Sequence, residues 1–151
     1  MRIVLQRVKE GKVIIDNRPV SAIGQGYLIF AGIGQDDQVQ DAEFLAKKIV
    51  NLRVFADAQG KMNLNIKQVL GEILSVSQFT LYADTDNGNR PGFEAAARPE
   101  LALNLWRQFN DFLRQGEINV QEGVFAADMQ VELVNDGPVT IILDSKKNNN
   151  F

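Results

Sequence analysis

Apolar and polar positions along the first third of the chain follow the pattern of short strands. Arg2 to Val8 alternates in part between the two kinds of side chain, and Gly26 to Ile33 is apolar on both faces. Glu10-Gly11 interrupts the pattern, and Asp16-Asn17-Arg18-Pro19 has the composition of a turn. The pattern predicts strands over residues 2–8, 13–15, 20–23 and 26–33.

Two later segments have helical spacing. From Val39 to Leu52 the apolar residues recur every three or four positions, and Asp37 with Gln40 fits a capping box before them. Pro99 suits the first position of a second helix and Gly116 suits its end. The sequence therefore predicts two amphipathic helices, the second with an apolar stripe of Leu101, Leu105, Phe109, Phe112 and Leu113.

The remaining apolar segments are again short and strand-like. The longest runs from Glu72 to Tyr82, and further strands are predicted at 53–56, 61–63, near Val120, and at 129–134 and 139–143. Many short strands with two helices predict an α+β fold, a curved, barrel-like, mostly antiparallel sheet with two main helices packed on it. We expect a single domain over residues 1–145 and a polar, disordered tail at residues 146–151.

The 151 residues include no Cys and no His. The chain therefore lacks a thiolate nucleophile and the histidine base on which Ser-His-Asp and Cys-His catalysis depend. Carboxylates are scattered, and their spacing selects no catalytic or metal-binding pair. An enzyme of this composition must use hydroxyls, carboxylates, amines, backbone amides or groups of its substrate, and we expect neither a cofactor nor a metal.

The net charge of −3 reflects 16 basic and 19 acidic residues, a balance that does not indicate a broad electrostatic surface for nucleic acid. Apolar stretches such as Tyr27 to Ala31 are shorter than a signal-peptide core or a membrane span. We therefore expect a cytoplasmic protein without a membrane partner.

Ser77-Gln78-Phe79-Thr80 is the first candidate site. Alternation along a strand would put Gln78 and Thr80 on one face, and Ser77 and Phe79 on the other. Polar groups in an apolar strand need hydrogen-bond partners or a wet cleft. The segment is therefore either a pocket wall, with hydroxyl and backbone N–H groups facing a ligand, or a half-buried strand in which Thr80 serves packing.

Asn135-Asp136-Gly137-Pro138 is the second candidate. Asp-Gly is a common turn pair, and a bond before Pro adopts the cis form at small cost. The segment is either a plain hairpin between two strands or a rigid turn whose carbonyl oxygens face a ligand. Because Pro has no N–H to donate, such a turn offers acceptors and suits an ammonium group.

The polar segment from Asp84 to Gly92 is the longest candidate for a functional loop. Within it, Arg90 is suited to contact phosphate, and the following Phe93 is suited to stack on a base. The alternative is a solvated surface loop without a ligand.

Four motifs follow one another along the chain. They are Met1-Arg-Ile-Val-Leu-Gln-Arg-Val8, Lys61-Met-Asn-Leu64, Val76-Ser-Gln-Phe-Thr-Leu-Tyr-Ala-Asp84 and Met129-Gln-Val-Glu-Leu-Val-Asn-Asp-Gly-Pro-Val-Thr140. In their order and spacing, from residue 1 to about residue 145, these motifs resemble the D-aminoacyl-tRNA deacylase family. The Ser-Gln-Phe-Thr and Gly-Pro pair is the most specific part of the resemblance, and it favours the functional interpretation of both segments.

The resemblance implies a homodimer that hydrolyses the ester joining a D-amino acid, or glycine, to the terminal adenosine of tRNA. It implies that Gly137-Pro138, with a cis peptide, enters the pocket of the partner subunit and holds the substrate α-amine through carbonyl oxygens. The floor of that pocket would consist of Ser77, Gln78, Phe79 and Thr80.

The same resemblance implies roles for residues outside these two motifs. Arg7 would brace the Gly-Pro turn, and Phe125 with Met129 would contact the adenine. We expect Arg90 to contribute to binding of the tRNA 3′ end. The sequence departs from the family's usual pattern close to Arg90, since Gly92 stands where the family usually has Ser after Arg-Pro.

An aminoacyl ester is already reactive, so a modest lowering of its barrier suffices. We expect the backbone N–H groups of Phe79 and Thr80 to bind the ester oxygen as it becomes an oxyanion, while the substrate's ribose hydroxyl and amine orient the water. Three alternatives stay open: Thr80 as nucleophile, a metal-dependent hydrolase that uses aspartates, and a non-catalytic dimeric module that binds RNA or a small ligand.

Overall fold

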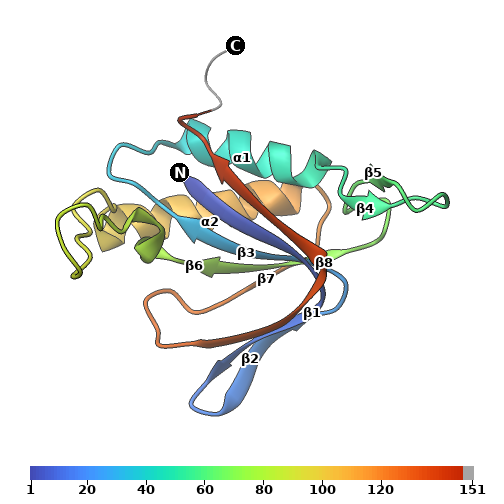
Figure 1. Cartoon of the computed structure of the whole chain (residues 1–151), viewed down its shortest axis with the longest axis horizontal. Helices are drawn as coiled ribbons and strands as arrows, with labels where there is room; N and C mark the ends of the chain where they lie inside the picture. The colour runs from blue at the N-terminus through green and yellow to red at the C-terminus, as the bar shows by residue number, and fades with distance from the viewer. Residues whose placement is uncertain (148–151) are drawn as a thin grey trace.

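The computed structural model describes residues 1–147, and residues 148–151 of the expected tail lie outside the described residues. Strands and helices follow one another along the chain as Figure 1 shows. In order they are β1 (Arg2–Ile15), β2 (Arg18–Ile23), β3 (Gly26–Gly32), α1 (Val39–Asn51), β4 (Phe55–Ala56), β5 (Met62–Leu64), β6 (Glu72–Ser77), the 3₁₀-helix η1 (Phe79–Tyr82), α2 (Pro99–Gln115), β7 (Val120–Glu122) and β8 (Gln130–Asp144).

A mixed sheet in the order β2-β1-β3-β6-β7 forms the centre of the molecule. β3 pairs with the first half of β1 and β2 with its second half, and β8 pairs with β1 along the opposite edge. β1 is antiparallel to β2, β3 and β8, whereas β6 is parallel to both β3 and β7. The sheet curves into a nearly closed barrel, and α1 and α2 lie side by side over one of its faces (Figure 1). The predicted α+β fold with a barrel-like, mostly antiparallel sheet and two helices is confirmed.

The larger core lies between the sheet and the two helices. Ile3 and Leu5 of β1 and Ile29 of β3 are fully buried there, against helix residues such as Leu45 and Phe109. These positions are the ones that alternation along a strand and helical spacing bring to a common face. The predicted Pro99 start and Gly116 end of the second helix are confirmed.

A second, smaller core fills the inside of the curved sheet, with Val8, Val13, Leu28 and Leu74 among its buried residues. A bulge opposite β8 makes this possible, because the pairing shifts between Val8 and Glu10 and so exchanges the two faces of β1 beyond that point. The prediction of two strands separated at Glu10-Gly11 is therefore wrong, since β1 continues through the bulge.

Three further predictions fail at element ends. The strand expected from Glu72 to Tyr82 stops at Ser77, because its neighbour β3 ends at Gly32 and offers no ladder to later residues. The alternating faces predicted for Gln78 and Thr80 are wrong for the same reason. The capping box of α1 lies one residue later than predicted, with Gln38 and Asp41 as partners.

Residues 145–147 form a turn in which Lys146 makes ion pairs with Asp37 and Asp41. Among the described residues, none of the helices has the length and apolar character needed to cross a membrane.

Candidate functional site

A cavity of 580 Å³ opens where β3 and β6 end, beside the start of α2 and the segment from Phe125 to Met129. Ser77, Gln78 and Phe79 lie on its wall together with Phe125 and Met129, so the structure brings these five predicted site residues together. Sequence reasoning missed the side chains that leave the space open, because alanines carry no chemical signal. They are Ala31, Ala96, Ala97, Ala102, Ala126 and Ala127.

The chain turns sharply at the rim of this cavity. The N–H of Gln78 still donates to the carbonyl of Ala31 at 2.8 Å, and η1 begins immediately afterwards. The first N–H groups of a helix have no carbonyl partner within it. The N–H groups of Phe79 and Thr80 accordingly have no hydrogen-bond partner among residues 1–147. Two adjacent donors are thus available beside the cavity.

The Thr80 hydroxyl lies next to these donors in an exposed position outside the cavity wall. It accepts a hydrogen bond from the Gln78 side-chain amide at 2.5 Å. An amide nitrogen cannot take a proton, and within residues 1–147 Thr80 has no hydrogen bond with a carboxylate or an amine. The geometry therefore supplies no general base for Thr80.

Aromatic side chains line two sides of the cavity. Phe79 and Phe93 meet edge to face with ring centroids 5.0 Å apart. The Phe125 ring packs against Trp106 with ring centroids 6.0 Å apart, and the indole N–H of Trp106 donates to the buried Ser75 hydroxyl at 2.9 Å. This wall is suited to hold a flat apolar group such as a nucleobase.

The Gly137-Pro138 peptide is cis and lies in the middle of β8. Both flanks of this segment pair with β1, as Val8 faces Asn135 and Gln6 faces Thr140, so that the segment bulges out of one continuous strand. The interpretation as a plain hairpin between two strands is therefore wrong.

Arg7 lies opposite this bulge and donates from Nε to the carbonyl of Asp136 at 2.9 Å. A second donor of the guanidinium, Nη1, bonds the carbonyl of Val54 at 2.5 Å. Asn135 closes the other side, since its Oδ1 accepts the N–H of Val139 at 2.8 Å. The bulge is thus held by side chains from both strands.

The bulge and the cavity do not meet within one chain. Ser77 is level with Ala31 of β3, which faces Ile3 of β1, whereas the bulge lies opposite Arg7. Three strand spacings and four residues along β1 separate them, which is roughly 14 Å across and 13 Å along the sheet.

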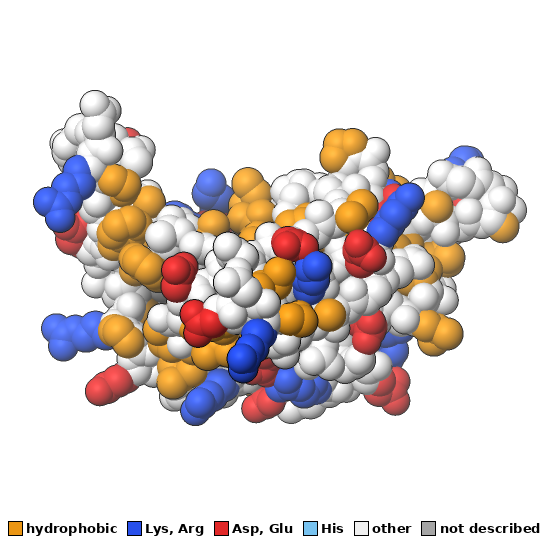
Figure 2. Space-filling view, turned by 90° about the horizontal axis from the view of Figure 1, so that it is seen from below, with side chains coloured by type: hydrophobic (Ala, Val, Ile, Leu, Met, Phe, Trp, Pro, Cys, Tyr) orange, Lys and Arg blue, Asp and Glu red, His pale blue; other side chains and the backbone are white. Residues whose placement is uncertain are grey.

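Arg90 is exposed in a loop that pairing between Asp84 and Gly92 closes, and it does not line the cavity. Figure 2 shows that Lys and Arg side chains alternate with Asp and Glu on the face seen from below. That face therefore has no continuous surface of positive charge. Within residues 1–147 there is no group of three or more acidic side chains arranged to hold a metal ion.

A family model described as D-Tyr-tRNA(Tyr) deacylase matches residues 4–144. The chain belongs to this family. Membership makes it a hydrolase of D-aminoacyl-tRNA and decides against a non-catalytic binding module.

Two solved structures are similar over nearly the whole deacylase chain. The c-Myc DNA Unwinding Element Binding Protein is 40% identical, with a TM-score of 0.89, and the match covers 95% of this chain and 98% of that one. A structure described as a probable eukaryotic D-amino acid tRNA deacylase is 16% identical, with a TM-score of 0.80 and coverage of 94% and 97%. The second likeness shows a common fold.

Proposed function

We propose that this deacylase binds the 3′ end of D-aminoacyl-tRNA in the cavity and hydrolyses the ester with the backbone N–H groups of Phe79 and Thr80. The observation that carries the proposal is a pair of adjacent N–H donors at the rim of an apolar cavity, neither of which has a partner within residues 1–147. Removing one such donor in a known enzyme costs about 2.7–4 kcal/mol, so two can supply most of the stabilisation that a reactive ester needs.

The terminal adenine occupies the cavity in this proposal. A volume of 580 Å³ lies within the usual range of small-molecule sites and admits a nucleoside. Phe125 and Met129 contact the base, and Ser77 and Gln78 lie below the ester. The attacking water is oriented by the ribose hydroxyl and the amine of the substrate, since the chain has no histidine to do so.

A second copy of the chain completes the site by inserting its Gly137-Pro138 bulge. The sheet separates bulge and cavity within one chain. On the sheet face away from the helices, the bulge-bearing strand β8 exposes 75% of Ile142, next to the partly exposed Val4. An apolar patch beside a feature that must reach another copy supports a homodimer.

Chirality follows from this arrangement by steric exclusion. The carbonyl oxygens of the partner's bulge fix the α-amine, and the N–H groups fix the ester oxygen. Two directions then remain at the α-carbon, one for its hydrogen and one for its side chain. An L side chain points into the wall, whereas a D side chain points to solvent. A glycyl ester is hydrolysed as well, because glycine has no side chain to meet the wall.

The activity itself can be tested with charged tRNA. We expect release of D-Tyr, D-Asp and Gly from tRNA at rates within about tenfold of one another, and L-Tyr release at the uncatalysed rate, because a clash rejects all L residues similarly. EDTA leaves the rates unchanged. A strict preference for one D side chain would contradict steric exclusion, and inactivation by EDTA would instead favour the metal-dependent mechanism.

Thr80→Ala separates the two uses of this residue. The variant keeps the backbone N–H and loses the hydroxyl, so we expect kcat to stay within about tenfold of wild type. Single-turnover release of D-Tyr measures it, and the thermal midpoint shows whether the variant is folded. A loss of several orders of magnitude in a folded variant would establish the hydroxyl as the nucleophile.

A further inference from the structure

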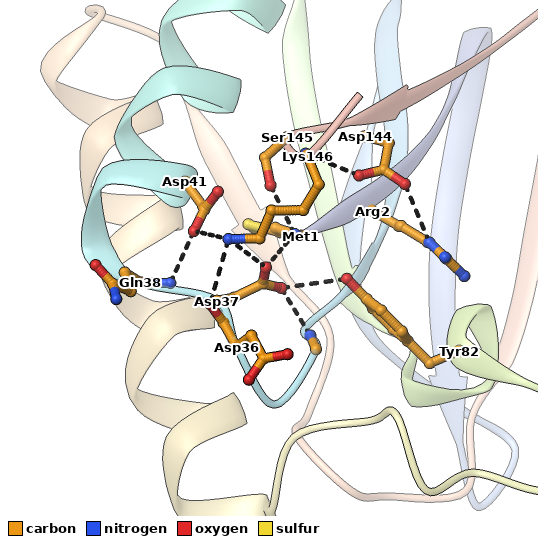
Figure 3. Close-up of polar contacts among 11 residues, drawn as sticks. Met1, Arg2, Asp36, Asp37, Gln38, Asp41, Tyr82, Asp144, Ser145 and Lys146 are labelled. Carbon is orange, nitrogen blue, oxygen red and sulfur yellow. Dashed lines mark hydrogen bonds and ion pairs between the residues drawn. The ribbon is translucent and has the colours of Figure 1, made fainter. Parts of the chain in front are cut away.

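A polar cluster of side chains holds the far end of η1 (Figure 3). The centre of this cluster is the Asp37 carboxylate, whose side chain is only 2% exposed. One oxygen, Oδ1, accepts from the α-amine of Met1 at 2.5 Å and lies 3.6 Å from Lys146 Nζ. The other, Oδ2, accepts from the Gly34 N–H at 2.7 Å and the Tyr82 hydroxyl at 3.2 Å.

Tyr82 is the last residue of η1, and three separate contacts hold it or its neighbour in place. Its hydroxyl reaches Asp37, its ring lies 4.5 Å below the Arg2 guanidinium, and Arg2 Nη1 donates to the carbonyl of Leu81 at 3.1 Å. Burial, followed by the nearby Asp37 charge, raises the pKa of Tyr82, so that the hydroxyl stays protonated and remains a donor.

Gly32, the last residue of β3, and Gly34, two residues beyond it, let η1 approach closely. A Cβ added to Gly32 would lie 2.9 Å from Leu81 Cβ, and one added to Gly34 would lie 2.8 Å from the Tyr82 ring. Side chains at either position would therefore push η1 away from the sheet. The turn that carries Phe79 and Thr80 is thus in close contact with two glycines and is fixed at its far end by Tyr82.

We propose that Tyr82, bonded to Asp37 and covered by Arg2, is a positioning residue that sets the orientation of the Phe79 and Thr80 N–H groups. This inference rests on the proposed function, in which those groups bind the developing oxyanion. Such donors stabilise a transition state only when they are held in place beforehand, so loosening η1 reduces kcat more than substrate affinity.

The chain has two tyrosines, and substitution of either by Phe removes one hydroxyl. The test therefore compares Tyr82→Phe with Tyr27→Phe as its control. Tyr27 is fully buried in the helix-side core, and its hydroxyl makes one long bond, 3.4 Å to the carbonyl of Leu52. We expect Tyr82→Phe to lower kcat about tenfold with KM within about twofold of wild type. Tyr27→Phe leaves kcat and KM unchanged, and Gly34→Ala follows Tyr82→Phe.

Hydrogen exchange tests the same inference without the reaction. The N–H groups of Leu81 and Ala83 bond the carbonyls of Gln78 and Thr80, and both report on η1. Tyr82→Phe should speed their exchange about tenfold, and Tyr27→Phe should not. Equal exchange and equal kcat in the two variants would overturn the positioning role. Faster exchange in a chain that releases no D-amino acid would uphold the role of Tyr82 in η1 and overturn the proposed function alone.

Discussion

An Ala102→Phe variant is expected to lose about a hundredfold in kcat/KM on D-aminoacyl-tRNA. Ala102 lies on α2 at the cavity wall, and a Phe side chain placed there fills space that the adenine would occupy. Burial of a base against aromatic side chains contributes about 1–3 kcal/mol, and the upper end of that range corresponds to about a hundredfold. Steady-state release of D-Tyr from tRNA measures the loss.

The control for Ala102→Phe is the same substitution at Ala58, which is exposed in the turn between β4 and β5. Ala102 is only 8% exposed, and a larger side chain in a packed core typically costs about 1–3 kcal/mol, so the thermal midpoint shows how much of the Ala102→Phe chain stays folded. Full activity in a folded Ala102→Phe variant would mean that the substrate does not enter this cavity.

The fold could be predicted from the sequence where the signal is local. Helical spacing, Pro99 at the start of α2 and Gly116 at its end define the second helix without reference to any other segment. The apolar segment from Gly26 to Ile33 likewise becomes β3, a nearly fully buried strand between two others. Such features depend on residues that are neighbours in the sequence.

Predictions failed where a distant segment decides the outcome. Glu10-Gly11 reads locally as a break, yet β8 pairs across it and converts it into a bulge. The segment around Gly137-Pro138 reads as a hairpin turn, yet both of its flanks pair with β1. The strand pattern through Phe79 would continue if β3 did not end at Gly32. Alternation cannot report these partners, because it records the two faces of a strand and not its neighbours.

The candidate site divides in the same way. Polar residues in an apolar strand mark Ser77 and Gln78 as unusual, and both line the cavity. Tyr82 and Asp37 are 45 residues apart in the sequence, so no spacing rule joins them. η1 also approaches Gly34 closely, and a glycine gives no indication in the sequence of which side chain will lie against it.

A Gly137→Ala variant is expected to lose at least about a hundredfold in kcat/KM while keeping its cavity intact. Gly137 has φ +148°, and an added Cβ would lie 2.7 Å from both the backbone nitrogen and Cγ2 of Val139. The bulge must therefore shift, and a displacement of about 1 Å at an amine-binding group can cost about a hundredfold. Release of D-Tyr and of Gly from tRNA should fall together, because both substrates present the same amine.

Coexpression of Gly137→Ala with Ala102→Phe tests whether bulge and cavity come from different subunits. In a heterodimer, one site combines the intact cavity of the Gly137→Ala subunit with the intact bulge of the Ala102→Phe subunit. Random pairing makes half of the dimers mixed, and one of the two sites in each mixed dimer is intact. About a quarter of wild-type activity should therefore return, although each variant alone keeps only about a hundredth of it. If instead each chain built its own site, every site would carry one lesion, and the mixture would be as inactive as its components.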